Sequence, residues 1–189
     1  MSAQEKQNLR VQIQGQRAKI SETELLSSEV DIASQDWGNL ISGEKVACYS
    51  SWGAEPGTSK LRRKLFELGK QVFLPVITSD TQMLWGIDQP PYVENKFGIS
   101  EPSVSNFELG SADAIILPAL CADEFGSRLG RGAGYFDRAL AGITPHELGG
   151  PIRIALLFDN EFLPSVPRDE HDELVDLLVT PTQIIRCKK

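Results

Sequence analysis

Four short runs of apolar residues constrain the fold of this chain more than any other feature of its sequence. They are KVACYSS (45–51), QVFLPVI (71–77), DAIILPAL (113–120) and IRIALLF (152–158). Nearly continuous apolar runs of this length are typical of strands that are covered on both faces of a sheet. We therefore expect a sheet that is buried between two layers of other elements.

A helical segment separates the first two of these runs. In TSKLRRKLFELGK (58–70) the leucines recur on one side of a helix, Thr58 stands at the N-cap position, and Gly69 follows the last turn. The order strand, helix, strand predicts a parallel crossover. Another helix-forming segment, YFDRALAG (135–142), follows the third run.

The N-terminal part of the chain predicts two further helices within residues 3–40, and Ser21 with Glu24 forms a capping box at the start of the second. Strands that alternate with helices indicate an α/β protein with helices on both faces of an open, mostly parallel sheet. We expect this three-layer α/β/α architecture to form a single domain over residues 1–189. In such sheets the ligand binds beyond the carboxyl ends of the strands.

The charge balance and the cysteines narrow the class of protein. The formal net charge is −7 and the isoelectric point is about 4.9, which argues against a nucleic-acid binder. Three widely separated cysteines lack metal-ligand spacing and indicate reduced thiols, with Cys48 and Cys121 in the core.

The sequence has neither a signal-peptide core nor an apolar run of the roughly 20 residues that a membrane span needs. We expect a cytoplasmic monomer.

The most distinctive motif is RLGRGAGYFDRAL (128–140), in which three glycines alternate with other residues before a helix. Backbone N–H groups of such a loop can converge on a phosphate, with charged hydrogen bonds from Arg128 and Arg131, and Asp137 could carry a magnesium ion. The alternative is a tight connection with solvated arginines and an ordinary helix-start carboxylate. Neither the Walker A motif nor the dinucleotide-binding GxGxxG motif fits the spacing.

A longer stretch around this loop, LPALCADEFGSRLGRGAGYFDRAL (117–140), resembles the signature of the 5-formyltetrahydrofolate cyclo-ligase family, also called methenyltetrahydrofolate synthetases. The resemblance extends over most of the chain. KQNLR (6–10), YSSWGAEPGT (49–58), ISEP (99–102) and VPRDEHDELVDLLVT (166–180) are similar to further landmarks of the family. The family fold is a three-layer α/β sheet resembling that of sugar-phosphate isomerases, in agreement with the architecture expected from the apolar runs.

The resemblance implies an ATP-dependent carbon–nitrogen cyclo-ligase. The family converts 5-formyltetrahydrofolate to 5,10-methenyltetrahydrofolate with ATP and Mg²⁺, and releases ADP and phosphate. ATP would phosphorylate the formyl oxygen and make it a leaving group for attack by the neighbouring amine. Because phosphoryl transfer depends on alignment and charge neutralisation, no covalent nucleophile is expected.

Matched positions imply three groups of site residues. The ATP-binding group is Lys6, Arg10, Arg128, Leu129, Gly130, Arg131, Gly132, Ala133, Gly134, Tyr135 and Phe136. The folate-binding group is Ser50, Glu55, Arg131, Gly132, Ala133, Gly134 and Tyr135, and the Glu55 carboxylate would accept paired hydrogen bonds from the pterin. The magnesium ligands are Asp137 and Asp172, whose carboxylates suit an ion that keeps part of its hydration shell.

Several of these residues also have an ordinary structural interpretation. Lys6 and Arg10 would be solvated residues of an N-terminal helix, and Ser50 and Glu55 would belong to a loop that caps the next helix. The segment RDEHDELVD (168–176) would be an acidic helix start with a solvated face.

Four more residues are not assigned to the site. Met83 and Trp85 lie where the family offers apolar walls to the folate, although such residues more often belong to the core. His146 and His171 are remote from any serine or cysteine nucleophile pattern, so we expect them at the surface.

Three departures from the family pattern bear on the substrate. Ala133 replaces a lysine of some relatives, Phe136 replaces the second tyrosine of the usual pair, and Val76 stands where an arginine is frequent. The sequence therefore does not decide which form of folate is preferred, and two rival functions remain. One is a sugar-phosphate isomerase or transferase that uses the same loop without ATP, and the other is a non-catalytic relative that binds folate or nucleotide.

Overall fold

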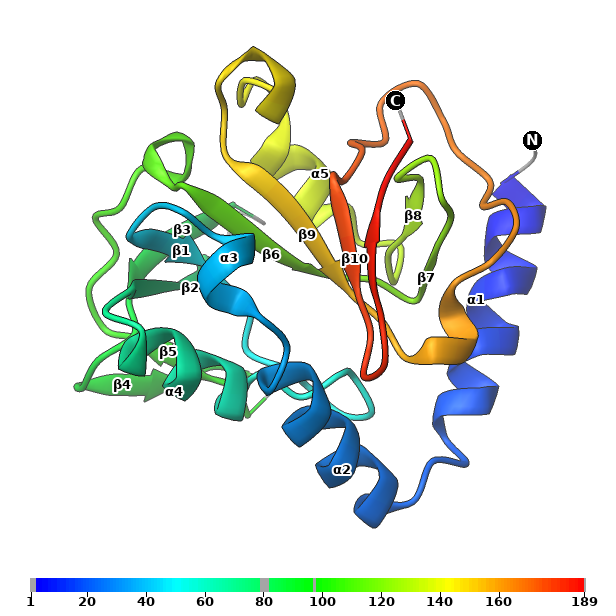
Figure 1. Cartoon of the computed structure of the whole chain (residues 1–189), viewed down its shortest axis with the longest axis horizontal. Coiled ribbons are helices and arrows are strands. Elements are labelled where there is room, and N and C mark those ends of the chain that lie inside the picture. Colours follow the sequence, from blue (N-terminus) through cyan, green and yellow to red (C-terminus); the bar gives the residue numbers. More distant parts are fainter. Residues whose placement is uncertain (1–2, 79–81, 97, 189) are drawn as a thin grey trace.

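A computed structural model describes residues 3–78, 82–96 and 98–188 of the chain, and a seven-stranded sheet forms its centre (Figure 1). The strand order is β11-β10-β9-β6-β1-β2-β3. The strands are β1 (Lys45–Ala47), β2 (Gln71–Ile77), β3 (Met83–Ile87), β6 (Ala114–Pro118), β9 (Ile152–Leu156), β10 (Leu177–Val179) and β11 (Ile184–Arg186). Neighbours from β10 to β2 pair in parallel, and the two edge strands β11 and β3 are antiparallel. The mostly parallel sheet expected from the four apolar runs is confirmed.

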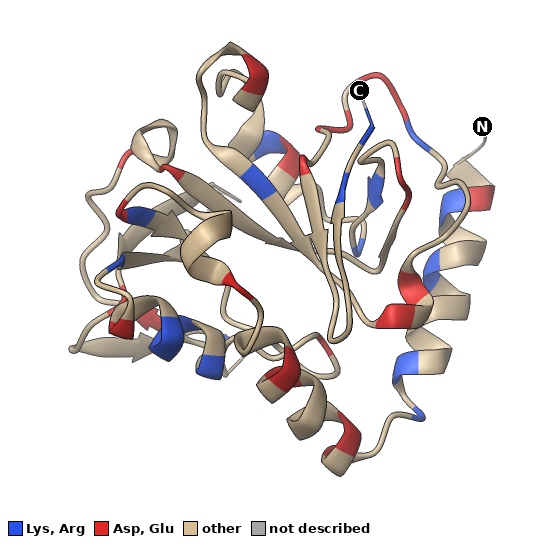
Figure 2. Cartoon of the chain, viewed as in Figure 1, with Lys and Arg blue, Asp and Glu red and all other residues tan. Residues whose placement is uncertain are grey.

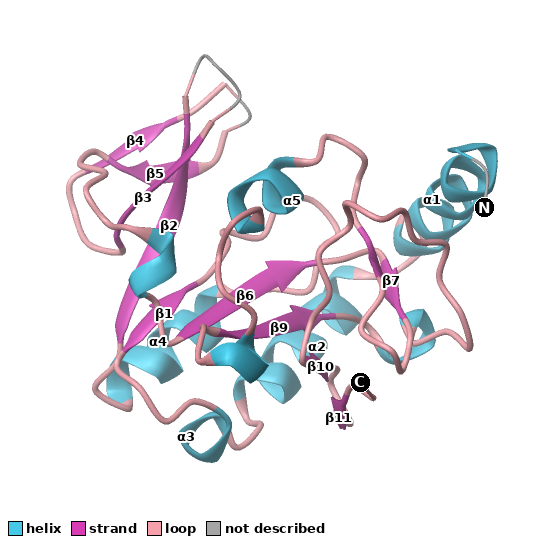
Figure 3. Ribbon diagram, turned by 90° about the horizontal axis from the view of Figure 1, so that it is seen from above, coloured by secondary structure: helices cyan, strands magenta, loops and turns pink. Residues whose placement is uncertain are grey.

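Helices cover both faces of this sheet. The helices of the described residues are α1 (Ala3–Arg17), α2 (Glu22–Ala33), α3 (Trp37–Leu40), α4 (Ser59–Glu67) and α5 (Tyr135–Leu140), with 3₁₀ turns at Leu109–Ser111, His146–Leu148 and Asp159–Glu161; all helices but α1 lie against the sheet. Figure 3 shows α5 on one side of the sheet and α2, α3 and α4 on the other. The three-layer α/β/α architecture is therefore confirmed.

Each sheet face has its own apolar cluster. Ile32, Trp37 and Leu61 pack on one face with Ile116 and Ile154 of the central strands. A second cluster covers the opposite face; its members include Leu109, Leu140 and Val175 of the covering elements and Ile115, Leu117 and Leu178 of the strands. Alternate strand residues thus point into different clusters, which explains why the strands are apolar almost without interruption.

Helix α1 lies apart from both layers and packs on a small hairpin (Figures 1 and 3). The hairpin pairs β7 (Cys121–Ala122) with β8 (Arg128–Leu129), and Ile13 of α1 joins its apolar side chains in a third cluster. The buried carboxylate of Asp123 holds the hairpin turn by accepting hydrogen bonds from the backbone N–H groups of Phe125 and Ser127. A further two-stranded sheet pairs β4 (Tyr92–Glu94) with β5 (Ser100–Pro102).

The local predictions at the helix ends are partly confirmed. The capping box of Ser21 and Glu24 is present, and Gly69 follows α4 with a φ of 76°. Thr58 occupies the N-cap of α4, but its hydroxyl donates to the Tyr49 carbonyl oxygen at 2.8 Å rather than capping the helix. The N-terminal region contains three helices rather than two, because Asp36 starts the short α3 by accepting a hydrogen bond from the Asn39 N–H.

Strand β1 is shorter than its apolar run, and this shortening opens the site. The run extends to Ser51, but the strand ends at Ala47. Beyond it the Tyr49 hydroxyl donates to the Pro56 carbonyl oxygen at 2.8 Å, and the Ser51 N–H donates to the Thr58 hydroxyl at 3.1 Å. These bonds turn residues 49–58 into a loop beyond the carboxyl end of the strand.

Charge is distributed unevenly over the helices (Figure 2). Helix α2 carries acidic side chains in its first turn and no basic residue in its last, whereas the adjacent α4 is rich in Lys and Arg. The two helices are joined by a hydrogen bond from the Lys60 N–H to the Glu29 carboxylate at 3.0 Å. None of the helices in the described ranges combines the length and the apolar character that crossing a bilayer requires.

The two core cysteines are expected to resist alkylation in the folded protein. Burial raises the pKa of both the Cys48 and the Cys121 thiol to about 12, so the reactive thiolate is nearly absent at pH 8. We expect iodoacetamide at pH 8 to leave both unmodified in the native protein and to modify both in denaturant, as measured by mass spectrometry. Cys187, which is partly exposed, is the internal comparison. Rapid native labelling of Cys48 or Cys121 would contradict the packing described above.

Candidate functional site

A cavity of about 660 Å³ opens beyond the carboxyl ends of β1 and β6. Its wall combines residues of α1, of the loop after β1, of β2, β3 and β5, of residues 118–120 and 128–138, and of residues 169–172. Every residue of the three predicted site groups lines this cavity. The sequence therefore placed the cavity at the correct edge of the sheet, and the fold brings together segments that are more than a hundred residues apart.

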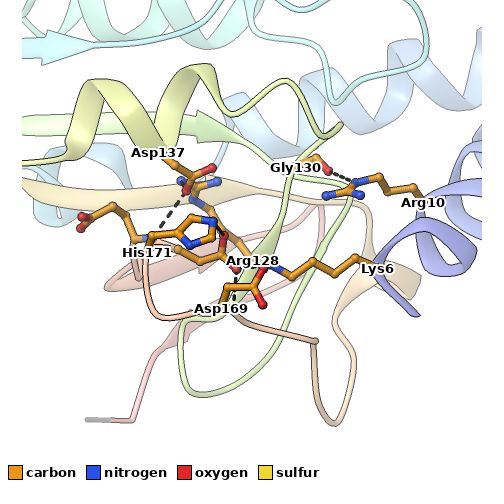
Figure 4. Close-up of polar contacts among 9 residues, drawn as sticks. Lys6, Arg10, Arg128, Gly130, Asp137, Asp169 and His171 are labelled. Carbon is orange, nitrogen blue, oxygen red and sulfur yellow. Dashed lines mark hydrogen bonds and ion pairs between the residues drawn. The ribbon is translucent and has the colours of Figure 1, made fainter. Parts of the chain in front are cut away.

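Two basic residues of α1 face the cavity instead of the solvent (Figure 4). The Lys6 ammonium donates to Asp169 Oδ2 at 2.7 Å and also to Asp172 Oδ2. Arg10 Nε donates to the Gly130 carbonyl oxygen at 3.0 Å. Lys6 is only 7% exposed, so its interpretation as a solvated helix residue is wrong.

The contacts of Lys6 and Asp172 stabilise both charges. Burial lowers the pKa of Lys6, but the hydrogen bonds and charges of Asp169 and Asp172 outweigh burial and raise it above its usual value. Burial raises the pKa of Asp172, but the Asp169 N–H and the Lys6 ammonium outweigh burial and lower it. Both groups are therefore charged near neutral pH.

The glycine loop connects β8 to α5 and forms the floor of the site. Gly132 and Gly134 have φ values of 104° and 68°, a region that favours glycine. A Cβ at Gly132 would lie 3.3 Å from the Arg10 guanidinium, which shows how closely α1 approaches the loop. The loop thus holds the backbone conformation that the sequence predicted at two of its three glycines.

Arg128 joins the start of this loop to helix α5. Its side chain is 2% exposed, and its Nη2 donates to Asp137 Oδ1 at 2.7 Å. Its Nε is buried and has no hydrogen-bond partner among the residues that the structure describes. Arg62 Nε and Arg153 Nε, whose residues do not line this cavity, share this property, so the suitability of Arg128 for an anionic partner rests on its place in the cavity wall.

On the opposite wall, Glu55 is held by the glycine loop. Arg131 Nε donates to Glu55 Oε1 at 2.9 Å, and the Trp52 N–H donates to Glu55 Oε2 at 2.9 Å. The Glu55 carboxylate is nearly buried, and Ser50 lies on the same wall. Glu55 is therefore positioned by a tertiary contact as well as by its own turn.

The segment 168–176 is not the helix start that its acidic pattern indicated. It forms an irregular loop in which Asp172 Oδ2 accepts a hydrogen bond from the Asp169 N–H at 2.7 Å. The loop approaches α5, where the Glu173 N–H donates to Asp137 Oδ1 at 3.4 Å. Asp137 and Asp172 therefore belong to one side of the cavity although 35 positions separate them.

The donor set on this side suits a hard cation. One ligand atom from each of Asp169, His171 and Asp172 lies within 4.8 Å of the others, and Asp137 lines the same cavity. Carboxylate oxygens are the protein ligands that Mg²⁺ prefers. In this structure the Lys6 ammonium contacts Asp169 and Asp172.

Ion pairs across the cavity link each predicted acidic residue to a predicted basic residue. Glu55 pairs with Arg131, Asp137 pairs with Arg128, and Asp172 pairs with Lys6. In each pair the two residues come from different elements or loops. The cavity is therefore locally charge-balanced, and a ligand that carries both phosphate and a divalent cation could exchange partners with these pairs.

The remaining predicted residues divide between wall and core. Met83 lines the cavity, whereas Trp85 is buried in the core and contacts the Phe136 ring edge-on at a centroid distance of 6.3 Å. Both histidines are exposed as expected, although His171 borders the cavity. Val76 is not part of the wall.

The cavity residues that sequence reasoning missed include Arg17, Trp52, Glu101 and Asp169. Arg17 had a signal in the sequence, since it follows Lys6 and Arg10 at helical spacing on one face of α1. Asp169 belongs to the acidic run that supplied Asp172. Trp52 and Glu101 had no signal beyond their position in matched segments.

Comparisons with known proteins agree with one another. The sequence profile of the 5-formyltetrahydrofolate cyclo-ligase family matches residues 2–181. A 5-formyltetrahydrofolate cyclo-ligase of Mycolicibacterium smegmatis is 35% identical over 96% of each chain, and that of Mus musculus is 30% identical over 93% of this chain and 89% of its own. The NMR structure of a 5,10-methenyltetrahydrofolate synthetase of Aquifex aeolicus superposes with a TM-score of 0.83 at 25% identity, covering 97% of this chain and 93% of that one.

Proposed function

Because this chain belongs to the 5-formyltetrahydrofolate cyclo-ligase family, we propose that it cyclises 5-formyltetrahydrofolate to 5,10-methenyltetrahydrofolate, with ATP as co-substrate and Mg²⁺ as cofactor. One observation carries the assignment of roles. All residues expected to bind ATP, folate and Mg²⁺ from the sequence line a single cavity of about 660 Å³. That volume suits a small-molecule site.

The phosphates of ATP are assigned to the basic side of the cavity. Lys6, Arg10 and Arg128 would contact them, together with the N–H groups of the glycine loop from Leu129 to Phe136. The position of Arg128 in the cavity wall at the start of the glycine loop supports this role, since a guanidinium forms strong charged hydrogen bonds to phosphate oxygens. Arg10 already lies against the loop through its bond to Gly130. The basic residues of α1 and those of the glycine loop would thus contact the same phosphate groups.

The reaction requires that the γ-phosphorus of ATP lie in line with the formyl oxygen of the folate. The formyl oxygen attacks the γ-phosphorus, and ADP leaves. N10 of the folate then attacks the formyl carbon, loses its proton, and the carbon–oxygen bond breaks to release phosphate. Neither step needs a covalent bond to the protein, so the residues act by alignment and charge neutralisation.

Asp137 and Asp172 would hold the magnesium ion, which neutralises negative charge on the phosphates when it is bound. The acidic donor set and its position beside the basic wall support this assignment. Lys6 and Arg128, which contact these carboxylates in the structure, would then turn toward phosphate oxygens. The ion pairs keep both sets of side chains ordered before ligands arrive.

Glu55 is assigned to the pterin. We expect Glu55→Gln to raise the KM for the folate about tenfold and to change the KM for ATP by less than twofold. A carboxylate can accept two N–H groups of the pterin, whereas one atom of an amide is itself a donor. Steady-state assays with each substrate varied in turn measure both constants. The exposed Glu108, which lies outside the cavity, gives the control variant Glu108→Gln. Equal effects on both substrates would remove Glu55 from the pterin site.

The first experiment is a direct assay of the proposed reaction. Purified protein, Mg²⁺, ATP and 5-formyltetrahydrofolate are mixed, and the near-ultraviolet absorbance of methenyltetrahydrofolate is followed together with ADP release. We expect the two products in equal amounts, and none without ATP. Binding of both ligands without product would identify a non-catalytic relative, and binding of neither would reopen the sugar-phosphate alternative.

We also propose that one copy of the chain is sufficient and that it works in a reducing compartment such as the cytoplasm. Every proposed contact comes from one copy of the chain, which supports a cavity that is complete in the monomer. Cys48 and Cys121 are buried thiols, which fits a reducing environment. Size-exclusion chromatography with light scattering tests the monomer.

A further inference from the structure

Trp52 differs from the other tryptophans of the chain in its surroundings. Trp37 and Trp85 are 0% and 3% exposed, whereas Trp52 is 46% exposed although it lies in the wall of the cavity. It also borders a second hollow of about 420 Å³ beside the first, together with Ser51, Tyr92 and Ile99. The indole therefore stands where the main cavity opens outward.

A cation covers the indole in this structure. The Arg131 guanidinium lies 5.0 Å from the centre of the Trp52 ring, and Arg131 Nη2 donates to the Trp52 carbonyl oxygen at 3.3 Å. Arg131 also binds Glu55, so one side chain of the glycine loop contacts both residues of the opposite wall. Cation–aromatic contacts at exposed sites are weak, so a ligand ring can displace the guanidinium.

We propose that the indole of Trp52 is the stacking surface for the p-aminobenzoyl ring of the folate, which takes the place of the Arg131 guanidinium. The inference rests on the proposed function and adds a contact to it. Folate carries two flat ring systems, and Glu55, which is assigned to the pterin, is nearly buried at 9% exposure. Trp52 lies three positions earlier and nearer the opening, so it meets the ring that follows the pterin. Flat rings stack well on indole.

Stacking at this position would also orient the reacting amine. The p-aminobenzoyl ring carries N10, the atom that must attack the formyl carbon. A ring held against the indole restricts rotation about the bonds that join it to the pterin, and this favours the geometry for cyclisation. Loss of the indole should therefore affect the folate and leave the ATP site largely intact.

Fluorescence of the unmodified protein tests the contact directly. Iodide should quench Trp52 and spare the two buried tryptophans, and the difference between the wild type and Trp52→Phe isolates its signal. We expect saturating 5-formyltetrahydrofolate without ATP to reduce this quenching at least threefold after correction for absorbance, and Mg-ATP alone to leave it unchanged. If equilibrium dialysis shows that folate binds but iodide still quenches Trp52 fully, the inference is overturned and the proposed function stays intact.

Kinetics of substituted proteins give a second, independent test. Trp52→Ala should raise the KM for the folate about tenfold, change the KM for ATP by less than twofold, and keep the far-ultraviolet circular dichroism of the wild type. Trp52→Phe should recover most of the loss. Phe66→Ala removes an exposed aromatic ring from α4, outside the cavity, and should match the wild type. An unchanged folate KM in Trp52→Ala would overturn the inference, whereas failure of the wild type to bind folate would overturn the proposed function itself.

Discussion

Replacement of Arg17 by methionine is expected to lower the free energy of unfolding by about 3–5 kcal/mol. The Arg17 guanidinium donates to both carboxylate oxygens of Glu161, at 2.6 and 2.8 Å, and to the Ala119 carbonyl oxygen at 2.6 Å. Both side chains of the pair are at least 96% buried. Methionine fills part of the space but leaves the Glu161 carboxylate without its partner in a buried position. Chemical denaturation at pH 7, followed by circular dichroism, measures the loss.

The pH dependence of this variant supplies a control. Burial raises the pKa of the Glu161 carboxyl and favours its protonated form, and Arg17 opposes this effect. The Arg17→Met variant lacks the positive charge that lowers the pKa of Glu161. The pKa of Glu161 in the folded state therefore rises further above its value in the unfolded chain. The loss of unfolding free energy relative to the wild type is therefore smallest below the pKa of Glu161 in the unfolded chain, about 4.3. This loss grows as the pH rises from there through the pKa of Glu161 in the folded variant. A deficit that is constant between pH 4 and pH 7 would contradict the buried-charge explanation.

A double substitution separates the charge from the packing. In Arg17→Met/Glu161→Gln no charge is left in the buried position, so this protein should be more stable than Arg17→Met alone. The pair also anchors α1, which carries Lys6 and Arg10 into the cavity. The double variant should therefore turn over folate with a raised KM for ATP. A double variant less stable than the single one would show that the ion pair is not the main contribution.

Asp137→Asn is expected to reduce turnover at limiting Mg²⁺ by at least about 100-fold while the protein stays folded. The substitution removes a negative charge from the proposed metal site, and the amide oxygen can still accept the hydrogen bond from Arg128. Part of the loss should be recovered at high Mg²⁺, because the remaining carboxylate of Asp172 still attracts the ion. Initial rates over a Mg²⁺ titration at fixed ATP and folate measure the effect.

The matched control for this substitution is Asp31→Asn. Asp31 is an exposed aspartate of α2 that does not line the cavity, and its replacement changes the net charge by the same amount. We expect its Mg²⁺ dependence to match that of the wild type. If Asp137→Asn also behaves like the wild type at limiting Mg²⁺, Asp137 is not a metal ligand and its bond to Arg128 is structural.

Strand periodicity and turn chemistry made much of the architecture predictable. The run at 71–77 coincides with β2, and the order of apolar runs and helices predicted the parallel sheet. The capping box of Ser21 and Glu24 formed as expected because its bonds involve residues three positions apart. The predicted helix start at 168–176 is absent, and the carboxylate of Asp172 is instead bound to Lys6, a residue at the other end of the chain.

Short-range patterns in the sequence determined the four central parallel strands, the capping box at Ser21 and the conformations of Gly132 and Gly134, because these depend on bonds and steric limits within a few residues. The resemblance of five segments to one family indicated which residues belong to the site. Only the tertiary structure decided how they meet. The contact of Lys6 with Asp169 spans 163 positions, and that of Arg131 with Glu55 spans 76. The helical spacing of Lys6 and Arg10 shows that both lie on one face of α1, but it does not show what that face packs against. Only the fold places this face, the glycine loop and the loop that contains Trp52 around one cavity.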